Sequence, residues 1–389
     1  MKTAAIICEY NPFHNGHAYQ IDRLRKSGFD RIVAVMSGNL VQRGELAVCD
    51  KFSRAKAALA GGADIVAEIP SLFSMSPADS FARAGVFIAE RLGCDTLAFG
   101  SETADTEKLT VIAERTESPE LDAEIGKLMK SGLMYPAARQ KAFEAVFGSC
   151  PELGNPNDIL ALEYIKAIKR SGAKIEPFCI ERKGVPHDGS TPDGEFASAS
   201  YIRSLIAQGK LDEAAKYIPK SSALILRDCE SKGRLSDPKL IDTAIISKIR
   251  GMSAAEFSKL CCAGDGLEFR LYNAARKAGS VEELINAVKT KRYTMARIKR
   301  AVLSAYFGLD SDLVNDDPHY VRILGLGKGG VDIVSGADKS GCPIVMRGTA
   351  LKDDAMFELE SKVTDMYVLS YKNPLPCGSE YTTGVIKYM

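Results

Sequence analysis

Short apolar runs alternate with amphipathic segments through about the first hundred residues of the chain. Each run is four to eight residues long and rich in β-branched or small side chains, as in strands buried on both faces. The predicted strands cover residues 4–8, 31–36, 63–70 and 96–99. The segments between them, such as 50–62 and 76–92, place apolar side chains three and four residues apart, as in helices. This alternation predicts a doubly wound parallel α/β sheet joined by crossover helices.

The pattern changes twice further along the chain. Residues from about 105 to 172 are helical in pattern, and a fifth strand is predicted at 175–180, so we interpret the helical stretch as an insertion before the last strand. Beyond residue 205 the strand pattern gives way to short helices. We therefore predict an N-terminal domain over residues 1–205 and a mainly helical domain over 206–389 that ends in a small α+β tail. Its last segment is expected to lie as an arm against the first domain.

Two histidines follow the first predicted strand. His14 and His17 come after the turn-forming pair Asn11-Pro12, at the start of a helical pattern. A helix N-terminus binds phosphate because its backbone N–H groups are unpaired and its dipole is positive there. The two imidazoles lie on one helical face, and Gly16 lets the backbone approach an anion. Only four residues of the chain are histidines, so the pair indicates nucleotide chemistry. The structural alternative is one histidine that caps the helix and one that packs locally.

Further polar side chains follow the other predicted strands, whose carboxyl ends share one crevice in an open α/β sheet. The segment 37–45 follows the second strand, and its Arg43 is either a ligand of phosphate or carboxylate or a solvated side chain. Gly100 follows the fourth strand, and Arg182 and Lys183 follow the fifth. No G-x-G-x-x-G sequence follows the first strand, which argues against a dinucleotide site.

Two helix starts complete the candidate site. Asn157 is a plausible N-cap after a Gly-Asn-Pro turn, and a contact with a nucleotide is the alternative. The sequence ASASYIR at residues 197–203 opens another helix, where Ser198, Ser200 and backbone amides can bind phosphates while Arg203 adds charge. An ordinary serine-capped helix is the alternative there.

The H-x-G-H sequence of residues 14–17 and the S-G-N-x-x-Q-R-G sequence of residues 37–44 resemble the tRNA-Met cytidine acetate ligase family, a branch of the H-x-G-H nucleotidyltransferases. The resemblance runs through nearly the full length. It implies a Rossmann-like nucleotidyltransferase (HUP-type) sheet, catalytic roles for His14 and His17, and an ATP site that includes Asn157. The expected ATP-binding residues are Ile7, Cys8, Glu9, Tyr10, Asn11, Pro12, Phe13, His14, Asn15, Gly16, His17, Ala18, Tyr19, Gln20, Gly100, Asn157, Arg182, Lys183, Ser198, Ser200 and Arg203.

A dense basic cluster with one aromatic residue lies in the predicted helical domain. Such side chains neutralise phosphates, and an interleaved ring stacks on a splayed base of single-stranded RNA. The pattern alone also fits a solvated helix face, and the family resemblance favours RNA. The expected RNA-binding residues are Lys289, Lys291, Arg292, Tyr293, Arg297 and Arg300.

The composition limits which partners and which cellular compartment are expected for the protein. A net charge of only +1 over 389 residues excludes a uniformly basic coat for nucleic acid, and no DNA partner is expected. Ten cysteines without a C-x-x-C pair predict reduced thiols, with no zinc or redox centre. No apolar run approaches the roughly 18 residues of a membrane span, so we expect a soluble, cytoplasmic protein.

The resemblance implies that ATP activates acetate as acetyl-adenylate with release of pyrophosphate. The acetyl group then passes to the exocyclic amine of the wobble cytidine of elongator tRNA-Met, and AMP is released. Mg²⁺ is expected only with the phosphates, since no paired carboxylates lie near the histidine loop.

Two other functions stay open. A small-molecule adenylyltransferase, of the pantetheine-phosphate or nicotinamide-mononucleotide type, expects a strict I-S-S-T-x-I-R element, from which Ala197, Ala199 and Ser200 depart. A non-catalytic nucleotide- or RNA-binding module is disfavoured by the intact histidines.

Overall fold

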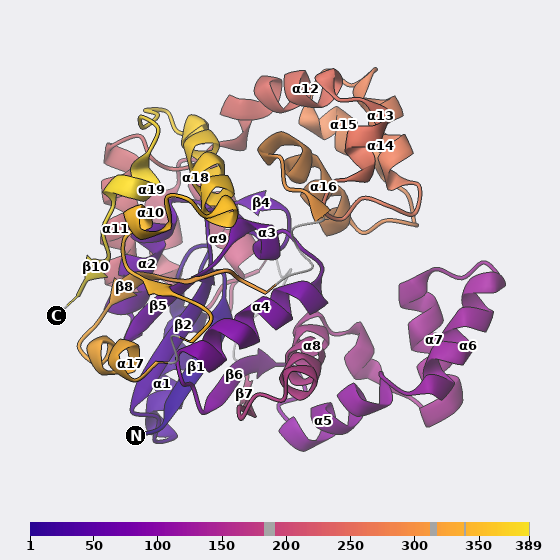
Figure 1. Cartoon of the computed structure of the whole chain (residues 1–389), viewed down its shortest axis with the longest axis horizontal. Helices are drawn as coiled ribbons and strands as arrows, with labels where there is room; N and C mark the ends of the chain where they lie inside the picture. The colour runs from indigo at the N-terminus through magenta and orange to yellow at the C-terminus, as the bar shows by residue number, and fades with distance from the viewer. Residues whose placement is uncertain (183–190, 312–316, 338–339, 389) are drawn as a thin grey trace.

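A twisted sheet with helices on both faces forms the centre of the computed structural model, which describes all residues except 183–190, 312–316, 338–339 and 389 (Figure 1). Its strands are β1 (Thr3–Cys8), β2 (Arg31–Ser37), β5 (Ile65–Ile69), β6 (Thr96–Ser101), β7 (Glu176–Glu181), β8 (Val321–Leu326), β9 (Ile344–Val345) and β10 (Ile386–Lys387). The order across the sheet is β10-β8-β5-β2-β1-β6-β7, with β9 beside β8. The five strands predicted at the N-terminus pair in parallel, which confirms the predicted fold class.

Helices cover both faces of the sheet because its strands are apolar on both sides. Ala4 and Ile6 of β1 pack toward α1 (Asn15–Lys26) and α2 (Lys51–Ala60), whereas Ala5 and Ile7 pack toward α4 (Ala78–Arg91) and α8 (Pro156–Ser171). Gly85 of α4 is needed at this contact, since a Cβ there would lie 2.4 Å from the side chain of Ile7. The carboxyl end of β1 is thereby held between the two helical layers.

The predicted helical insertion is present between β6 and β7. It consists of α5 (Thr106–Arg115), α6 (Pro119–Lys130), α7 (Tyr135–Phe147) and α8. The pair α6 and α7 projects from the body of the molecule (Figure 1), while α8 returns to pack on α4.

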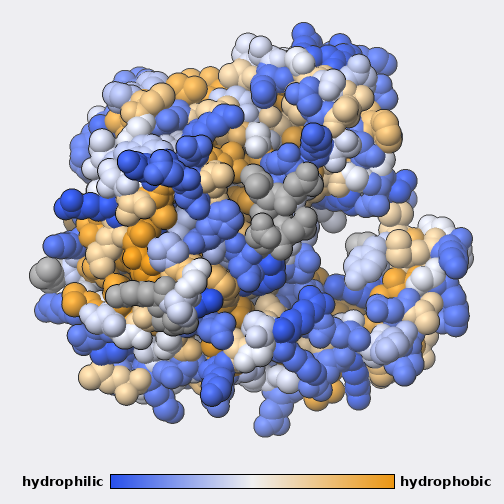
Figure 2. All heavy atoms as spheres, viewed as in Figure 1, coloured by the Kyte–Doolittle hydropathy of each residue, from blue (hydrophilic) through white to orange (hydrophobic). Residues whose placement is uncertain are grey.

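The predicted helical region follows β7. Its helices are α9 (Ala199–Ala207), α10 (Leu211–Ala214), α11 (Lys220–Ser231), α12 (Asp242–Gly251), α13 (Ala254–Ser258), α14 (Leu267–Ala275), α15 (Val281–Val288) and α16 (Met295–Phe307). Helices α12 to α15 form a lobe, and a notch with hydrophilic margins separates it from α6 and α7 (Figures 1 and 2). Within the described residues, no helix is both long and apolar enough to cross a membrane.

The tail departs from the predicted domain division. Strand β8 was expected in the small tail of the C-terminal domain, but it joins the main sheet antiparallel to β5. Without β8, the backbone groups on the outer side of β5 would lack a ladder partner. The remaining tail elements are α17 (Gly330–Gly336), α18 (Ala355–Tyr367) and α19 (Ser379–Thr382). Strand β10 pairs with β8, which confirms that the end of the chain lies as an arm against the first domain.

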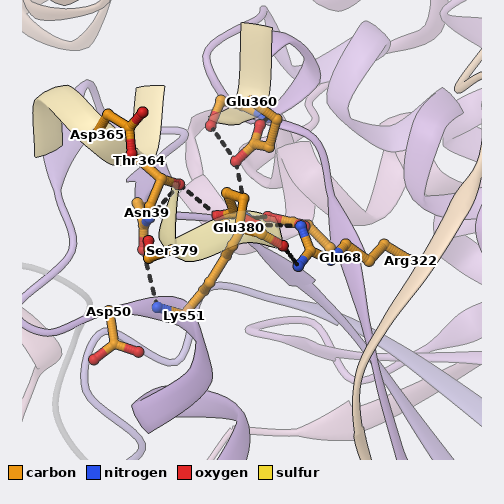
Figure 3. A network of polar contacts seen from close by, with 12 residues as sticks. Asn39, Asp50, Lys51, Glu68, Arg322, Glu360, Thr364, Asp365, Ser379 and Glu380 are labelled. Atoms are coloured by element: carbon orange, nitrogen blue, oxygen red, sulfur yellow. Dashed lines mark hydrogen bonds and ion pairs between the residues drawn. The ribbon is translucent and has the colours of Figure 1, made fainter. Parts of the chain in front are cut away.

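Buried charges hold this tail to the N-terminal part (Figure 3). Lys51, at the start of α2, contacts the Glu68 carboxyl group of β5 and forms ion pairs with Glu380 of α19 at 2.7 Å and with Glu360 of α18 at 3.3 Å. Arg322 of β8 pairs with the other oxygen of Glu380. All five side chains are at most 1% exposed. The chain ends are therefore joined by desolvated ion pairs as well as by the strand pairing.

Candidate nucleotide site

A cavity of about 420 Å³ opens at the carboxyl ends of β1, β6 and β7, where an open α/β sheet is expected to bind its ligand. Most of the predicted ATP-binding residues line it. They are Ile7, Cys8, Glu9, Tyr10, Asn11, His14, Gly16, His17, Tyr19, Gln20, Gly100, Asn157, Arg182 and Ser198.

Both histidines belong to the first turn of α1. His14 is the N-cap, and its Nδ1 accepts a hydrogen bond from the Gly16 N–H at 3.0 Å. His17 Nδ1 accepts one from the His14 N–H at 3.3 Å, which completes a capping box. The rings stack with their centroids 3.7 Å apart. The capping alternative and the phosphate-binding prediction are therefore compatible, because an Nδ1 that accepts a bond leaves the proton of a neutral imidazole on Nε2.

The turn before α1 is fixed from several sides. Tyr10 is fully buried with a φ of 46°, and its ring lies 4.7 Å from that of His17. The Asn11 side chain accepts a hydrogen bond from the Val48 N–H at 2.8 Å, and the Asn11 carbonyl accepts one from Arg203 at 2.9 Å. The histidines are thus placed by contacts with residues far away in the sequence.

Charged groups lie on the side of the cavity formed by the hairpin of β3 (Leu40–Val41) and β4 (Glu45–Leu46). Glu9 Oε1 accepts a hydrogen bond from the Gln42 N–H at 2.9 Å. Burial raises the pKa of Glu9, although Arg203 and Arg43 oppose that shift. Gln42 and Arg43 both line the cavity, so Arg43 lies in the site rather than on a solvated surface.

The N-terminus of α8 forms another wall. Asn157 is not the N-cap as predicted, because α8 begins at Pro156 and Asn155 precedes it. Asn157 Oδ1 instead accepts a hydrogen bond from Arg182 at 3.2 Å, and its amide group donates to Glu102. Proline is favoured at the first helical position because it has no N–H to satisfy, and the helix accordingly starts two residues earlier than predicted.

Cys8 is unsuited to nucleophilic catalysis. Burial raises the pKa of its thiol, and Sγ lies 3.7 Å from the Val35 carbonyl as a weak donor. The thiolate, which is the reactive form, is disfavoured in this position.

Several predicted residues lie near the cavity without lining it. Phe13 is buried against Gly61, the Asn15 amide donates to the Glu195 carbonyl at 2.8 Å, and Arg203 pairs with Glu45 at 3.0 Å. The residues outside the lining are Pro12, Phe13, Asn15, Ala18, Ser200 and Arg203. Arg203 therefore supports the histidine turn, whereas Ser198 caps α9 by accepting from the Tyr201 N–H and also lines the cavity. Lys183 lies outside the described residues.

The cavity also has an apolar wall, of which only Ile7 was predicted. Its residues are Ile7, Ala78, Phe81, Phe99, Leu160 and Tyr164, which belong to β1, β6, α4 and α8. Phe99 and Tyr164 lie with their ring centroids 5.9 Å apart. In the sequence these residues share the spacing of ordinary core positions, so no pattern separates them from the core.

The basic cluster divides into an exposed part and a buried part. Lys289, Lys291 and Arg292 are exposed between α15 and α16. Tyr293 is only 3% exposed and donates to the Asp265 carbonyl at 2.7 Å, so the prediction that it stacks on RNA is wrong for this conformation. Arg297 donates to the carbonyls of residues 262–264.

Arg300 is 7% exposed and also turns inward. A buried guanidinium needs hydrogen-bond acceptors, and loop carbonyls supply them to both Arg297 and Arg300. No cluster of three or more His, Cys, Asp or Glu side chains suited to a metal ion occurs in the part of the chain that is described.

Sequence comparison places the chain among known nucleotidyl transferases. Residues 1–380 match the model of the HIGH Nucleotidyl Transferase family. The tRNA(Met) cytidine acetate ligase of Thermoanaerobacter sp. (strain X514) is 36% identical over 402 residues, which cover 100% of both chains. The enzyme of that name from Bacillus subtilis (strain 168) is 34% identical over 390 residues, covering 96% of this chain and 94% of the relative.

Solved structures show the same fold. The apo crystal structure of Thermotoga maritima TmcAL matches with a TM-score of 0.93 at 32% identity, covering 100% of this chain and 99% of the other. Thermotoga maritima TmcAL bound with alpha-thio ATP matches with a TM-score of 0.90 at 31% identity over 100% of both chains. The resemblance inferred from residues 14–17 and 37–44 is thus confirmed over the full length.

Proposed function

Because this chain belongs to the tRNA(Met) cytidine acetate ligase family of HIGH nucleotidyl transferases, we propose that it activates acetate with ATP and transfers the acetyl group to a cytidine of tRNA(Met). The observation that carries the proposal is the pair His14 and His17 at the N-terminus of α1. Their Nδ1 atoms accept the capping hydrogen bonds, and both side chains line the cavity. The cavity volume of about 420 Å³ lies within the range of sites for ligands of this kind.

In the first step a carboxylate oxygen of acetate attacks the α-phosphorus of ATP. A new P–O bond forms, the bond to the bridging oxygen breaks, and pyrophosphate leaves with the electron pair. Nε2–H groups of His14 and His17 donate to the phosphoryl oxygens as negative charge develops there. This role needs no proton transfer, and the N-terminus of α1 adds its positive potential.

In the second step the exocyclic amine of cytidine attacks the acetyl carbon. The new C–N bond replaces the bond to the adenylate oxygen, AMP leaves, and the nitrogen loses one proton. The wobble position and the elongator tRNA are part of the proposal through the family. A tRNA substrate would place the reaction in the cytoplasm.

The apolar wall suits the methyl group of acetate. Ile7, Phe81, Phe99 and Tyr164 exclude water from the place where the mixed anhydride forms, and water would otherwise hydrolyse it. Arg43, which also lines the cavity, is the cation proposed to hold the carboxylate.

The exposed Lys289, Lys291 and Arg292 are the proposed contacts with tRNA phosphates. Mg²⁺ would enter with ATP and be held by its phosphates, since the described residues form no metal cluster. Its chemistry would be neutralisation of the charge on the leaving pyrophosphate.

The test is exchange of labelled pyrophosphate into ATP, with and without acetate. We expect acetate-dependent exchange that falls by about 100-fold or more in His17→Ala, because a preorganised donor at the reacting phosphoryl group is lost. His319→Ala is the matched control, since His319 pairs with Asp354 at the surface of the tail and lies outside the cavity.

The runner-up is a small-molecule adenylyltransferase. It shares the histidine turn, but the ASASYIR segment departs from its phosphate-binding element. Exchange that is independent of acetate and depends on a phosphorylated small molecule would favour that function and contradict the ligase proposal.

A further inference from the structure

Helix α16 contacts the hairpin of β3 and β4 through Arg300, which was predicted to bind RNA, and through its neighbour Lys299. Arg300 Nη1 donates to the Gln42 carbonyl at 2.9 Å, and its Nε lies 3.1 Å from Cys262 Sγ. Lys299 pairs with Glu45 at 2.7 Å. Both ends of the hairpin turn, Gln42 and Glu45, are therefore tied to one helix that belongs to the C-terminal region.

The contact at Gly44 is also a steric one. Gly44 has a φ of +73°, and a Cβ at this position would lie 2.5 Å from the Arg300 backbone nitrogen and 2.7 Å from Lys299 Cβ. The hairpin tip thus rests directly on the backbone of α16. Glycine is required twice here, for its left-handed conformation and for the close approach.

The hairpin also contacts the segment between β1 and α1, which leads to the two histidines. The Gln42 N–H donates to Glu9 Oε1, and the Gln42 carbonyl accepts from Arg300. The backbone of Gln42 is therefore held by the nucleotide site through its N–H and by α16 through its carbonyl. Glu45 pairs with Arg203 as well as Lys299, and Arg203 donates to the Asn11 carbonyl. Burial would raise the pKa of Glu45, but these two cations keep it low.

We propose that Arg300 is a positioning residue for acetate activation: through the Gln42 carbonyl it holds the β3–β4 hairpin so that Gln42 and Arg43 line the nucleotide cavity. This hydrogen bond from Arg300 to the Gln42 carbonyl matters in the first chemical step, before the acceptor RNA is involved. The helical region therefore contributes to the ATP site itself, in addition to its exposed basic segment at residues 289–292.

The inference predicts a different phenotype for buried and exposed members of the same basic cluster. Arg300→Ala should slow acetate-dependent pyrophosphate exchange without RNA present, mainly through kcat. Lys291→Ala, at an exposed proposed contact with tRNA phosphates, should weaken the transfer of the acetyl group to tRNA. A direct RNA contact by Arg300 would instead spare the exchange reaction.

The test combines two measurements on the full-length protein. Amide hydrogen exchange reports the hairpin directly, and we expect protection of residues 40–47 to fall about tenfold in Arg300→Ala. Pyrophosphate exchange reports the chemistry, and a loss of about tenfold in kcat with a smaller change in the KM for ATP is expected. A lysine at position 300 can still donate to the Gln42 carbonyl, so Arg300→Lys should restore part of the hairpin protection and part of kcat.

The matched control is Arg250→Ala. Arg250 also donates to backbone carbonyls of the helical region, those of Ala275 and Ala278, but does not touch the hairpin. Unchanged hairpin protection in Arg300→Ala, or an equal loss in Arg250→Ala, would overturn the inference. The exchange measurement rests on the proposed function, whereas hydrogen exchange does not. An inactive wild type would therefore contradict the ligase proposal and leave hydrogen exchange to decide the positioning role.

Discussion

Phe81 illustrates how one side chain of the cavity wall can set substrate range. It projects from the first turn of α4, is 3% exposed, and lines the cavity together with Ile7 and Tyr164. In the proposed reaction the acetyl group lies at this wall, where a longer acyl chain would meet the ring. Hydrophobic pockets discriminate by about 1–3 kcal/mol per methylene, so the fit at this wall is measurable in rates.

We expect Phe81→Ala to widen the range of carboxylates that are activated. The ratio of kcat/KM for propionate over acetate should rise by about tenfold or more in the pyrophosphate exchange reaction, because the deleted ring leaves room for one more methylene. The variant should also lose about 3–5 kcal/mol of stability. Phe87→Ala, a deletion on the same helix outside the cavity, is the control. An unchanged ratio together with weaker ATP binding would place the adenine, not the acyl group, at this wall.

At this scale the sequence predicts side chains whose chemistry is local. His14 and His17 were predicted from a strand, a turn and a helix start within one short segment, and the structure places them in the cavity. Phe81 and Tyr164 were missed because an apolar residue on a cavity wall has the same periodicity as one in the core. Tyr293 and Arg300 were misplaced because their burial depends on contacts with segments far away in the sequence.

Among the elements, the start of α8 is organised by one carboxylate. Asp158 is fully buried and accepts hydrogen bonds from the Glu102 N–H at 3.0 Å, from Thr103 Oγ1 at 2.8 Å and from Asn155 Nδ2 at 2.8 Å. Burial alone would raise the pKa of Asp158, but hydrogen bonds from Ser101, Asn155 and Thr103 lower it. It joins the carboxyl end of β6 to the helix turn that carries Asn157.

Asp158→Asn should disturb the site through this element. One amide N–H of the new side chain would face existing donors, so we expect a loss of about 1–3 kcal/mol in the free energy of unfolding. The KM for ATP should rise several-fold with a smaller change in kcat, since Asn157 and Arg182 move with the helix start. Asp105→Asn, at the N-cap of α5, removes a similar charge outside the cavity and should leave KM unchanged. Equal KM values in both variants would contradict the role of Asp158.

The element boundaries show where sequence reasoning reaches its limit. The parallel strands and the helical insertion follow from local periodicity and are confirmed. The pairing of β8 with β5 joins residues more than 250 positions apart, and no local pattern encodes that partner. The strand predicted in the tail is therefore present as an element, but its place in the main sheet was not predicted.

The whole molecule is closed by the buried network of Lys51, Glu68, Arg322, Glu360 and Glu380 (Figure 3). Two cations face three carboxyl groups, so charge balance requires one proton. Burial, together with Glu360 and Glu380, raises the pKa of Glu68 from 4.5 to about 8 in spite of Lys51. Burial acts in the same direction on Glu380, but Lys51 and Arg322 lower its pKa below the ordinary value. The proton therefore belongs on Glu68, whose Oε2 has no hydrogen-bond partner among the described residues.

This proton makes stability depend on pH with a defined sign. The folded chain keeps the proton on Glu68 between pH 4.5 and about 8, whereas the unfolded chain has lost it, so the free energy of unfolding falls as the pH rises through this window. Glu68→Gln imitates the protonated acid and removes that slope. The free energy of unfolding of Glu68→Gln minus that of the wild type should therefore rise by on the order of 2–3 kcal/mol from pH 6 to pH 8.5.

Chemical denaturation at the two pH values measures the difference between the variant and the wild type, in which all other titrating groups cancel. Glu380→Gln is the control of opposite sign: it leaves Lys51 and Arg322 short of a buried counter-charge and should cost about 3–5 kcal/mol. That cost should shrink as the pH falls through the lowered pKa of Glu380, because the wild type then loses the same ion pairs. A Glu68→Gln variant whose stability follows the wild type at both pH values would show that Glu68 is ionised in the folded protein. The balancing proton would then have to lie on another carboxyl group of the network.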